Sequence, residues 1–181
     1  MLNAELGMQN LEILNRIYLV GYMGAGKTTA AKRIAKRLGW GAVDTDALFE
    51  EKYKISVDDF FQKYDEPLFR KLESEILKTT ENFDHTVIST GGGTACYFDN
   101  MDWMNRNGLT VFMRISPESV IYRVLHSHHK RPLARGKSEE ELMEYVGWHY
   151  ASRMPFYEQA QITVKSENFD LDGLMESIRA L

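Results

Sequence analysis

The chain has 181 residues, a net charge of -4 at pH 7 and a single cysteine, Cys96. Its length favours one well-buried domain, residues 1–181, rather than two. The acidic balance argues against a general nucleic-acid binder, which needs a basic surface, and the lone cysteine excludes an intrachain disulfide and a Cys-based zinc site and fits a reducing cytoplasm.

Residues 1–15 mix Asn, Glu and Gln with isolated apolar residues. They lack the basic and apolar regions of a secretory signal, and no run in the chain reaches the length of a membrane span. We therefore expect a short amino-terminal extension with no assigned function, on a cytoplasmic protein without a membrane partner.

Five short β-forming runs alternate with helical patterns along the chain. The alternation predicts an α/β fold in which helices wrap a parallel sheet. No repeat or proline-rich linker divides the chain, which supports a single domain. The predicted strands cover residues 17–20, 42–44, 86–89, 109–115 and 162–164.

Residues 21–28 read Gly-Tyr-Met-Gly-Ala-Gly-Lys-Thr, between the first β run and a helical pattern at residues 29–38. This is the phosphate-binding pattern G-x-x-x-x-G-K-[ST] in its strand-loop-helix context. Glycines let backbone N–H groups point at phosphate oxygens, and the helix start adds a positive dipole end. Lys27 is expected to reach the β and γ phosphates and the Thr28 hydroxyl to bind Mg²⁺. A glycine-rich turn that carries a lysine by chance is the weaker alternative.

Asp44 and Asp46 follow the second β run at alternate positions. If the strand geometry persists, their side chains point to one side, at the sheet edge where open α/β sheets bind ligands. The pair suggests one carboxylate for a metal shell and one for an acceptor hydroxyl. The alternative is a solvated turn whose Asp-Thr-Asp sequence caps the next helix.

Residues 46–81 are expected to form an acceptor-binding region of short helices. Ser56 has capping-box spacing ahead of one helix, and another helical pattern covers residues 65–80. In that second helix Arg70 lies four residues beyond Glu66, so an exposed ion pair of small energy is the plain alternative to a binding role.

Three glycines, Gly91, Gly92 and Gly93, directly follow the third β run. They expose backbone N–H groups and allow a ligand to approach closely. A flexible turn would explain the triplet equally simply.

Residues 126–137 are strongly basic and broken by proline and glycine, which indicates a mobile cationic lid. Arg131 precedes a proline, so it is expected to be extended and to project from the lid. Helix starts are predicted at Ser116, before this lid, and at Ser138, directly after it. Arg153, close before Pro155, could be a cation at a helix end.

Taken together, these motifs resemble those of the shikimate kinase family from about Arg16 onward. The resemblance implies the three-layer P-loop kinase fold of the nucleoside monophosphate kinase-like group, with a five-stranded parallel sheet in the order 2-3-1-4-5. The motifs that carry it are the phosphate loop, Asp44-Thr45-Asp46, Phe69-Arg70 with Glu73, Gly91 to Gly93, Arg131-Pro132-Leu133, and Arg153-Met154-Pro155-Phe156-Tyr157 followed by Ala160.

The resemblance implies transfer of the γ-phosphoryl group of ATP to the 3-hydroxyl of shikimate, giving shikimate 3-phosphate and ADP in chorismate and aromatic amino-acid biosynthesis. It implies Lys27, Asp46 and Arg131 as catalytic residues, and Mg²⁺ held by Thr28 and, through water, by Asp44. For ATP binding the resemblance also implies Gly24, Ala25, Gly26, Lys27, Thr28, Thr29, Arg123 and Arg131. For shikimate binding it implies Asp46, Arg70, Gly91, Gly92, Gly93 and Arg153.

The chain departs from the usual family pattern at Asp65, where glycine is common, and at Ala134, where leucine is common. The spacing from Arg123 to Arg131 is about one residue longer than usual. Two alternatives stay open: a kinase of the same fold for another polyhydroxy acid such as gluconate, and a nucleotide-binding module without transfer activity. The expected assembly is a monomer.

Overall fold

The computed structural model describes residues 14–126 and 138–181. In this part of the chain five parallel strands form one sheet in the order β2-β3-β1-β4-β5, which confirms the expected fold. Each strand agrees with its expected run to within one residue at either end. The strands are β1 (Arg16–Val20), β2 (Gly41–Asp44), β3 (Thr86–Ser89), β4 (Leu109–Arg114) and β5 (Ile162–Lys165).

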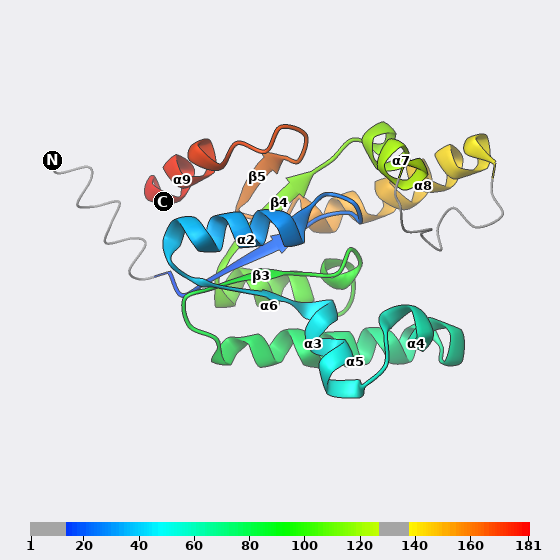
Figure 1. Cartoon of the computed structure of the whole chain (residues 1–181), viewed down its shortest axis with the longest axis horizontal. Coiled ribbons are helices and arrows are strands. Elements are labelled where there is room, and N and C mark those ends of the chain that lie inside the picture. The colour runs from blue at the N-terminus through cyan, green and yellow to red at the C-terminus, as the bar shows by residue number, and fades with distance from the viewer. Residues whose placement is uncertain (1–13, 127–137) are drawn as a thin grey trace, which may run out of the picture.

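Helices lie on both sides of this sheet (Figure 1). The helix after the phosphate loop packs on the three strands β1, β2 and β3, while others pack on β4 and on one another. The α-helices are α2 (Lys27–Leu38), α3 (Thr45–Tyr53), α4 (Val57–Lys63), α5 (Glu66–Thr79), α6 (Asn100–Asn107), α7 (Pro117–Leu125), α8 (Glu139–Tyr157) and α9 (Leu171–Arg179), and the short 3₁₀ helices are η1 (Thr80–Asn82) and η2 (Thr94–Cys96).

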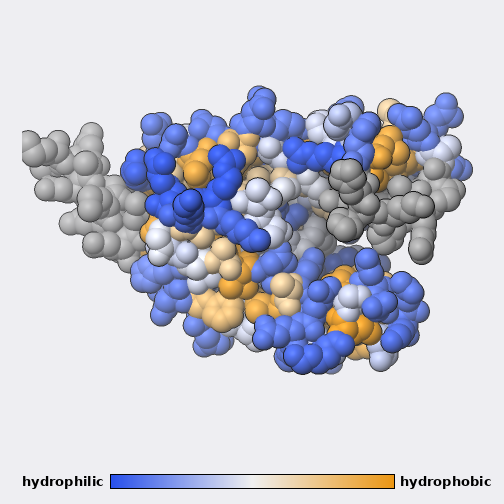
Figure 2. Space-filling model, viewed as in Figure 1, coloured by the Kyte–Doolittle hydropathy of each residue, from blue (hydrophilic) through white to orange (hydrophobic). Residues whose placement is uncertain are grey.

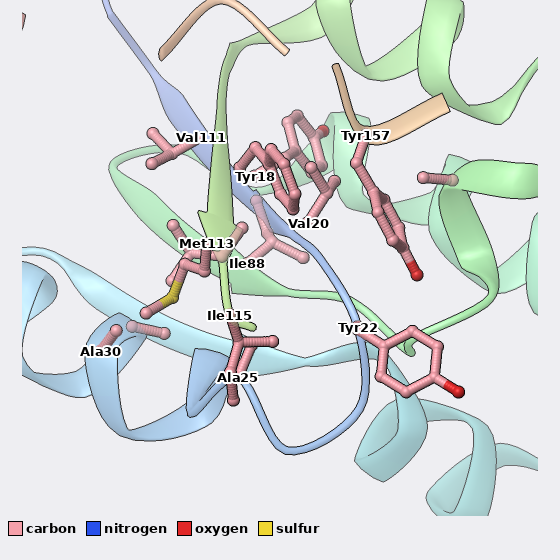
Figure 3. Packing of buried hydrophobic residues seen from close by; sticks show 14 of the residues in the cluster. Tyr18, Val20, Tyr22, Ala25, Ala30, Ile88, Val111, Met113, Ile115 and Tyr157 are labelled. Atoms are coloured by element: carbon pink, nitrogen blue, oxygen red, sulfur yellow. The ribbon is translucent and has the colours of Figure 1, made fainter. Parts of the chain in front are cut away.

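The three inner strands are apolar and buried along almost their whole length, as expected for strands covered on both faces. Figure 3 shows residues of β1, β3 and β4 packed together, with Ala30 of α2 on one side. The two outer strands, β2 and β5, are only partly buried. This rigid centre fixes the carboxyl edge of the sheet, from which the candidate site is built.

A second, smaller core lies under the predicted acceptor region. Phe49, Phe60, Phe69 and Ile76 bring α3, α4 and α5 together, apart from the main core. The aromatic rings of Phe49 and Phe69 are 5.1 Å apart. Apolar side chains also gather on the surface at α4 (Figure 2), where Phe61 and Tyr64 are exposed. The region therefore has packing of its own, which positions Arg70 independently of the sheet.

The three predicted serine caps are confirmed. The hydroxyls of Ser56, Ser116 and Ser138 accept hydrogen bonds from backbone N–H groups three residues on, at the starts of α4, α7 and α8. The expected helix end before Pro155 is wrong, because α8 continues to Tyr157. Proline removes a single N–H donor, and in the last turn that loss does not stop the helix.

Helix α6 and the turn before it were not predicted from the sequence. The helix has no side-chain cap and few apolar residues. Its first residue, Asn100, is instead buried and bonded to the Thr94 carbonyl at 2.8 Å and to the Ser74 hydroxyl at 2.6 Å. The contact with Ser74 comes from α5, 26 residues earlier, so the local sequence gives no signal for it.

The predicted amino-terminal extension lies largely outside the described residues, as does the predicted lid apart from His126. No helix of the described part is both long and apolar enough to cross a lipid bilayer.

Candidate active site

A cleft of about 400 Å³ opens at the carboxyl ends of β1, β2 and β3. It collects the predicted phosphate loop, both aspartates and two of the three glycines in one place. Its lining residues are Met23, Gly24, Gly26, Lys27, Thr28, Thr29, Asp44, Asp46, Ser89, Thr90, Gly91 and Gly92.

The phosphate loop has the geometry that its glycines predict. Gly24 and Gly26 both have φ near +80°, the left-handed region that glycine adopts without strain. Helix α2 begins at Lys27, two residues before the expected start, and Gly26 caps it without a side-chain bond. The first N–H groups of α2 are therefore available to a phosphate, together with the positive end of the helix dipole.

Lys27 is buried, and its ammonium group lies against the loop itself. Its Nζ donates hydrogen bonds to the carbonyls of Gly21 at 2.7 Å and Tyr22 at 3.0 Å. The positive charge is thus held at the mouth of the loop, where a bound polyphosphate would meet it.

Thr28, Asp44 and Ser89 form a group of oxygen atoms beside the loop. The Thr28 hydroxyl donates to Asp44 Oδ2 at 2.7 Å and lies 3.3 Å from the Ser89 hydroxyl. Hydroxyl and carboxylate oxygens are the ligands that Mg²⁺ prefers, usually with one or two carboxylates and substrate phosphates. The described residues contain no group of three His, Cys, Asp or Glu side chains that could hold a metal ion, so a metal here would also need ligands from a bound nucleotide. These residues therefore fit a Mg²⁺ that arrives with a nucleotide.

The Asp-Thr-Asp sequence caps the next helix, as one of its two interpretations predicts, and both of its aspartates line the cleft. Asp44 caps α3, since its Oδ1 accepts a hydrogen bond from the Asp46 N–H at 3.0 Å, while its Oδ2 faces Thr28. The expectation that strand geometry aligns the two aspartates is wrong, because α3 begins at Thr45. Asp46 reaches the cleft from the first turn of a helix instead.

Asp46 lies in an environment that favours its neutral form. Burial, together with the negative charges of Asp44 and Glu73 and against the opposing charge of Lys27, raises the pKa of this carboxyl to about 6. A carboxylate with a pKa near neutrality can accept a proton from a hydroxyl group in the transition state.

The predicted ion pair of Arg70 with Glu66 is present, but only Glu66 is exposed, because Arg70 itself is buried. Its Nε and Nη2 donate to Glu66 at 3.0 and 2.9 Å, and its Nη1 donates to Glu73 at 2.9 Å. The guanidinium also lies 4.4 Å from the centre of the Tyr97 ring. Burial lowers the pKa of Arg70, but Glu73 and Glu66 outweigh it and raise the pKa overall. A guanidinium carries five N–H donors, so one remains on each terminal nitrogen for a ligand.

The three glycines are required by close approach, which a flexible turn alone does not explain. A Cβ atom on Gly91 would lie 2.7 Å from Glu73 Oε1, and one on Gly93 would lie 2.6 Å from Arg70 Nη1. On Gly92 it would lie 3.0 Å from the Met23 nitrogen. None of the three has a positive φ. The glycine backbone therefore lies close to Glu73 and Arg70 at Gly91 and Gly93, and close to the phosphate loop at Gly92.

Arg153 reaches this region from α8. It is buried, and its guanidinium carbon lies 5.8 Å from the centre of the Tyr22 ring. One turn further on, the Tyr157 hydroxyl donates to the Gly92 carbonyl. Helix α8 is thereby fixed to both the phosphate loop and the glycine turn.

Arg123 connects the phosphate loop to the turn after β5. Its Nη1 donates to the Gly24 carbonyl at 2.6 Å and to the Ser166 hydroxyl at 3.3 Å, while that hydroxyl donates to the Ala25 carbonyl at 2.5 Å. Arg123 is thus beside the nucleotide loop, as expected. Arg131 lies outside the described residues.

Ser89 and His149 are among the residues of this region that the sequence did not indicate. Ser89 ends β3 beside Thr28, and its place at the carboxyl end of a buried β run was the available signal. His149 bonds to the Tyr22 hydroxyl, and its position in the middle of a helix gave no signal.

The carboxyl edge of the parallel sheet thus carries a phosphate loop, an acidic pair and two buried arginines. This combination is that of a P-loop phosphotransferase that acts on a small anionic acceptor. Comparison with known proteins specifies the family. The family model for shikimate kinase matches residues 23–180. The chain belongs to the shikimate kinase family.

The relatives cover most of the chain. The shikimate kinase of Parabacteroides distasonis is 41% identical, over 85% of this chain and 89% of its own. The crystal structure of shikimate kinase from Bacteroides thetaiotaomicron has a TM-score of 0.82 at 38% identity, and it covers 92% of this chain and 95% of its own. The Acinetobacter baumannii shikimate kinase in complex with shikimate has a TM-score of 0.78 at 29% identity, covering 94% and 93%. The resemblance found in the sequence is thereby confirmed, and the chain is a kinase that uses ATP.

Proposed function

We propose that the cleft transfers the γ-phosphoryl group of ATP to the 3-hydroxyl of shikimate, giving shikimate 3-phosphate and ADP for chorismate and aromatic amino-acid biosynthesis. The assignment of roles depends mainly on one observation. Asp46 lines the same cleft as Lys27, and a Cβ atom on Gly91 would lie 3.0 Å from Asp46 Oδ1 and 2.7 Å from Oε1 of Glu73, the partner of Arg70. A proton acceptor is therefore adjacent to both a phosphate-binding and a carboxylate-binding group.

We assign the acceptor carboxylate to Arg70 and Arg153. The two glutamates occupy the sides of the Arg70 guanidinium and leave its end, with one N–H on each terminal nitrogen, suited to bidentate binding. Arg153 forms no salt bridge with a carboxylate in residues 14–126 or 138–181. Two such cations would fix the shikimate ring so that its 3-hydroxyl lies in line with the γ phosphate of ATP. Gly91, Gly92 and Gly93 would contribute close backbone approach.

The chemical step needs proton removal and charge stabilisation. Asp46 would accept the proton of the attacking hydroxyl or orient that hydroxyl. Lys27 would stabilise the negative charge that spreads over the transferred group in the loose transition state, and Arg131 would add to it as the family resemblance implies. The ATP phosphates would be bound by Gly24, Gly26 and the start of α2, with Ala25 and Thr29 next to these residues. Arg123 would lie toward the adenine base.

Thr28 and Asp44 would hold Mg²⁺, Thr28 directly and Asp44 through water. When bound, the ion neutralises phosphate charge and orients the terminal phosphate. We also propose that the enzyme is a monomer and that it acts in the cytoplasm, which its single cysteine fits.

The magnesium assignment predicts the behaviour of Asp44→Asn. Asparagine is as good an N-cap as aspartate, so α3 should form normally. Loss of the charge should raise the Mg²⁺ concentration needed for half-maximal rate about 10-fold or more. ADP release measured over a Mg²⁺ titration checks this. Asp170→Asn, the same change at the remote cap of α9, is the control, and an Asp44→Asn titration that superimposes on the control would contradict the assignment.

A coupled ADP-release assay over a panel of acceptors tests the function itself. Shikimate should be turned over with Mg²⁺-ATP, and gluconate should not. Turnover of gluconate with none of shikimate would show a kinase for another polyhydroxy acid. Nucleotide binding without transfer to either would show a binding module.

A further inference from the structure

Tyr22, the second residue of the phosphate loop, contacts a histidine far away in the chain. Its hydroxyl lies 2.7 Å from Nδ1 of His149 on α8, and the two rings meet edge to face at 5.5 Å. Figure 3 shows the Tyr22 side chain beyond the strand ends, with its hydroxyl pointing away from the core residues Ala25 and Ile115. A fully buried tyrosine needs a partner for its hydroxyl, and His149 supplies it.

The same tyrosine touches both halves of the active site. Its carbonyl accepts hydrogen bonds from Lys27 Nζ at 3.0 Å and from the Ala25 N–H at 3.2 Å, which fix its backbone in the loop. Its ring lies under the guanidinium of Arg153, at 5.8 Å from the ring centre. A cation over an aromatic face is held there by the ring quadrupole. The angle of this ring therefore sets where Arg153 lies.

We infer that His149 is a positioning residue for the kinase reaction: by fixing the Tyr22 hydroxyl, it holds the Tyr22 ring and so Arg153 in the place that binds the acceptor. His149 touches neither substrate in this scheme. It acts through Tyr22, whose backbone stays anchored in the loop, so acceptor binding depends on the contact more than nucleotide binding does. The inference rests on the proposed function because it takes Arg153 as a carboxylate ligand.

The charges around His149 suit this role. Burial, together with the positive charges of Arg153 and Arg70 and against the opposing charge of Glu66, lowers the pKa of the imidazole to about 4. The ring is thus neutral near pH 7. A neutral imidazole can accept the Tyr22 hydroxyl hydrogen without adding a second cation beside Arg153.

Steady-state kinetics of four variants tests the inference. His149→Leu removes the polar atom at similar volume, Tyr22→Phe removes the hydroxyl and keeps the ring, and the double variant removes both. His149→Asn places an amide near the position of Nδ1. One neutral hydrogen bond predicts that His149→Leu and Tyr22→Phe each raise the KM for shikimate about 3- to 10-fold. The KM for ATP should change less than about 2-fold, since the backbone bonds of Tyr22 remain.

Two further results are expected. The double variant should be no worse than either single variant, because both remove the same interaction. His149→Asn should recover most of the affinity for shikimate, but only when Tyr22 is present. Trp148→Phe, at the exposed neighbouring position on α8, is the control for packing around His149 and should leave both KM values unchanged.

Thermal melting separates this role from a structural one. All kinetics are measured well below the lowest Tm of the set. If His149→Leu lowers Tm but leaves the KM for shikimate at the wild-type value, or if both KM values rise equally, the inference is overturned. Turnover of shikimate by the wild-type chain is the separate readout: its absence overturns the proposed function and the inference with it.

Discussion

Asp46→Asn is expected to lower kcat about 10²- to 10⁴-fold, the usual loss when a general base is removed. The amide has the shape of the carboxylate and can still orient a hydroxyl, but it cannot take a proton. ATP affinity should stay nearly unchanged, because the phosphate loop and Lys27 are untouched. ADP release at saturating substrates gives kcat, and calorimetric binding of ADP gives the nucleotide affinity. Asp58→Asn, at an exposed position of α4, is the control.

The pH dependence gives this prediction a second readout. The pKa of Asp46 is about 6, and the carboxylate is the active form. The kcat/KM of the wild type should therefore be level above pH 7 and fall about tenfold per pH unit well below pH 6. The variant should lack this acidic limb. Equal losses of turnover and ADP affinity in Asp46→Asn, or an unchanged acidic limb, would contradict the role of Asp46.

The same substitution should make the protein more stable at alkaline pH. The pKa of Asp46 is higher in the folded state than the value of about 3.9 in an unfolded chain, so the carboxyl favours folding below that value and loses this contribution as pH rises through 6. Asparagine does not titrate. Its advantage over the ionised wild type should reach up to about 3 kcal/mol at pH 8 and vanish below pH 4. Wild-type Asp46 thus lowers stability in favour of activity.

The parts of this fold that could be predicted from sequence are those set by local pattern. The β runs at residues 17–20 and 86–89 are short and bounded by turns, so they correctly predicted strands, whereas the order of the strands came from the family resemblance. The phosphate loop was predictable because its glycines, Lys27 and Thr28 act within one strand-loop-helix unit. The serine caps were correct for the same reason, since Ser138 bonds to the N–H of Glu141, three residues away.

The parts that could not be predicted depend on contacts distant in sequence. Arg70 reads as an exposed partner of Glu66 until Tyr97 and Glu73 are seen to enclose it. Asp46 was assigned to the right cleft for the wrong reason, because the local spacing does not reveal that α3 starts at Thr45. The contact between Tyr22 and His149 spans 127 positions. Only the fold brings such pairs together.

Arg153→Ala is the second variant for which we expect a large effect. Loss of one cation from a buried, hydrogen-bonded charge pair costs about 2–5 kcal/mol, so the KM for shikimate should rise about 30-fold or more. The KM for ATP should change little, because Arg153 is not among the residues that line the cleft around the phosphate loop. Arg153→Lys should be intermediate, since an ammonium keeps the charge but loses the bidentate geometry. Initial rates over a shikimate titration at saturating ATP measure this.

An acceptor without the carboxylate identifies the atoms involved. If Arg153 binds the carboxylate, a neutral analogue, such as the primary amide of shikimate, should be used equally poorly by the wild type and by Arg153→Ala, because the interaction is already absent. Arg179→Ala, on the exposed face of α9, should leave the KM of both acceptors unchanged. A loss for the amide as large as that for shikimate would instead mean that Arg153 holds Tyr22 and the loop in shape, and the carboxylate would then have to be assigned to Arg70 alone.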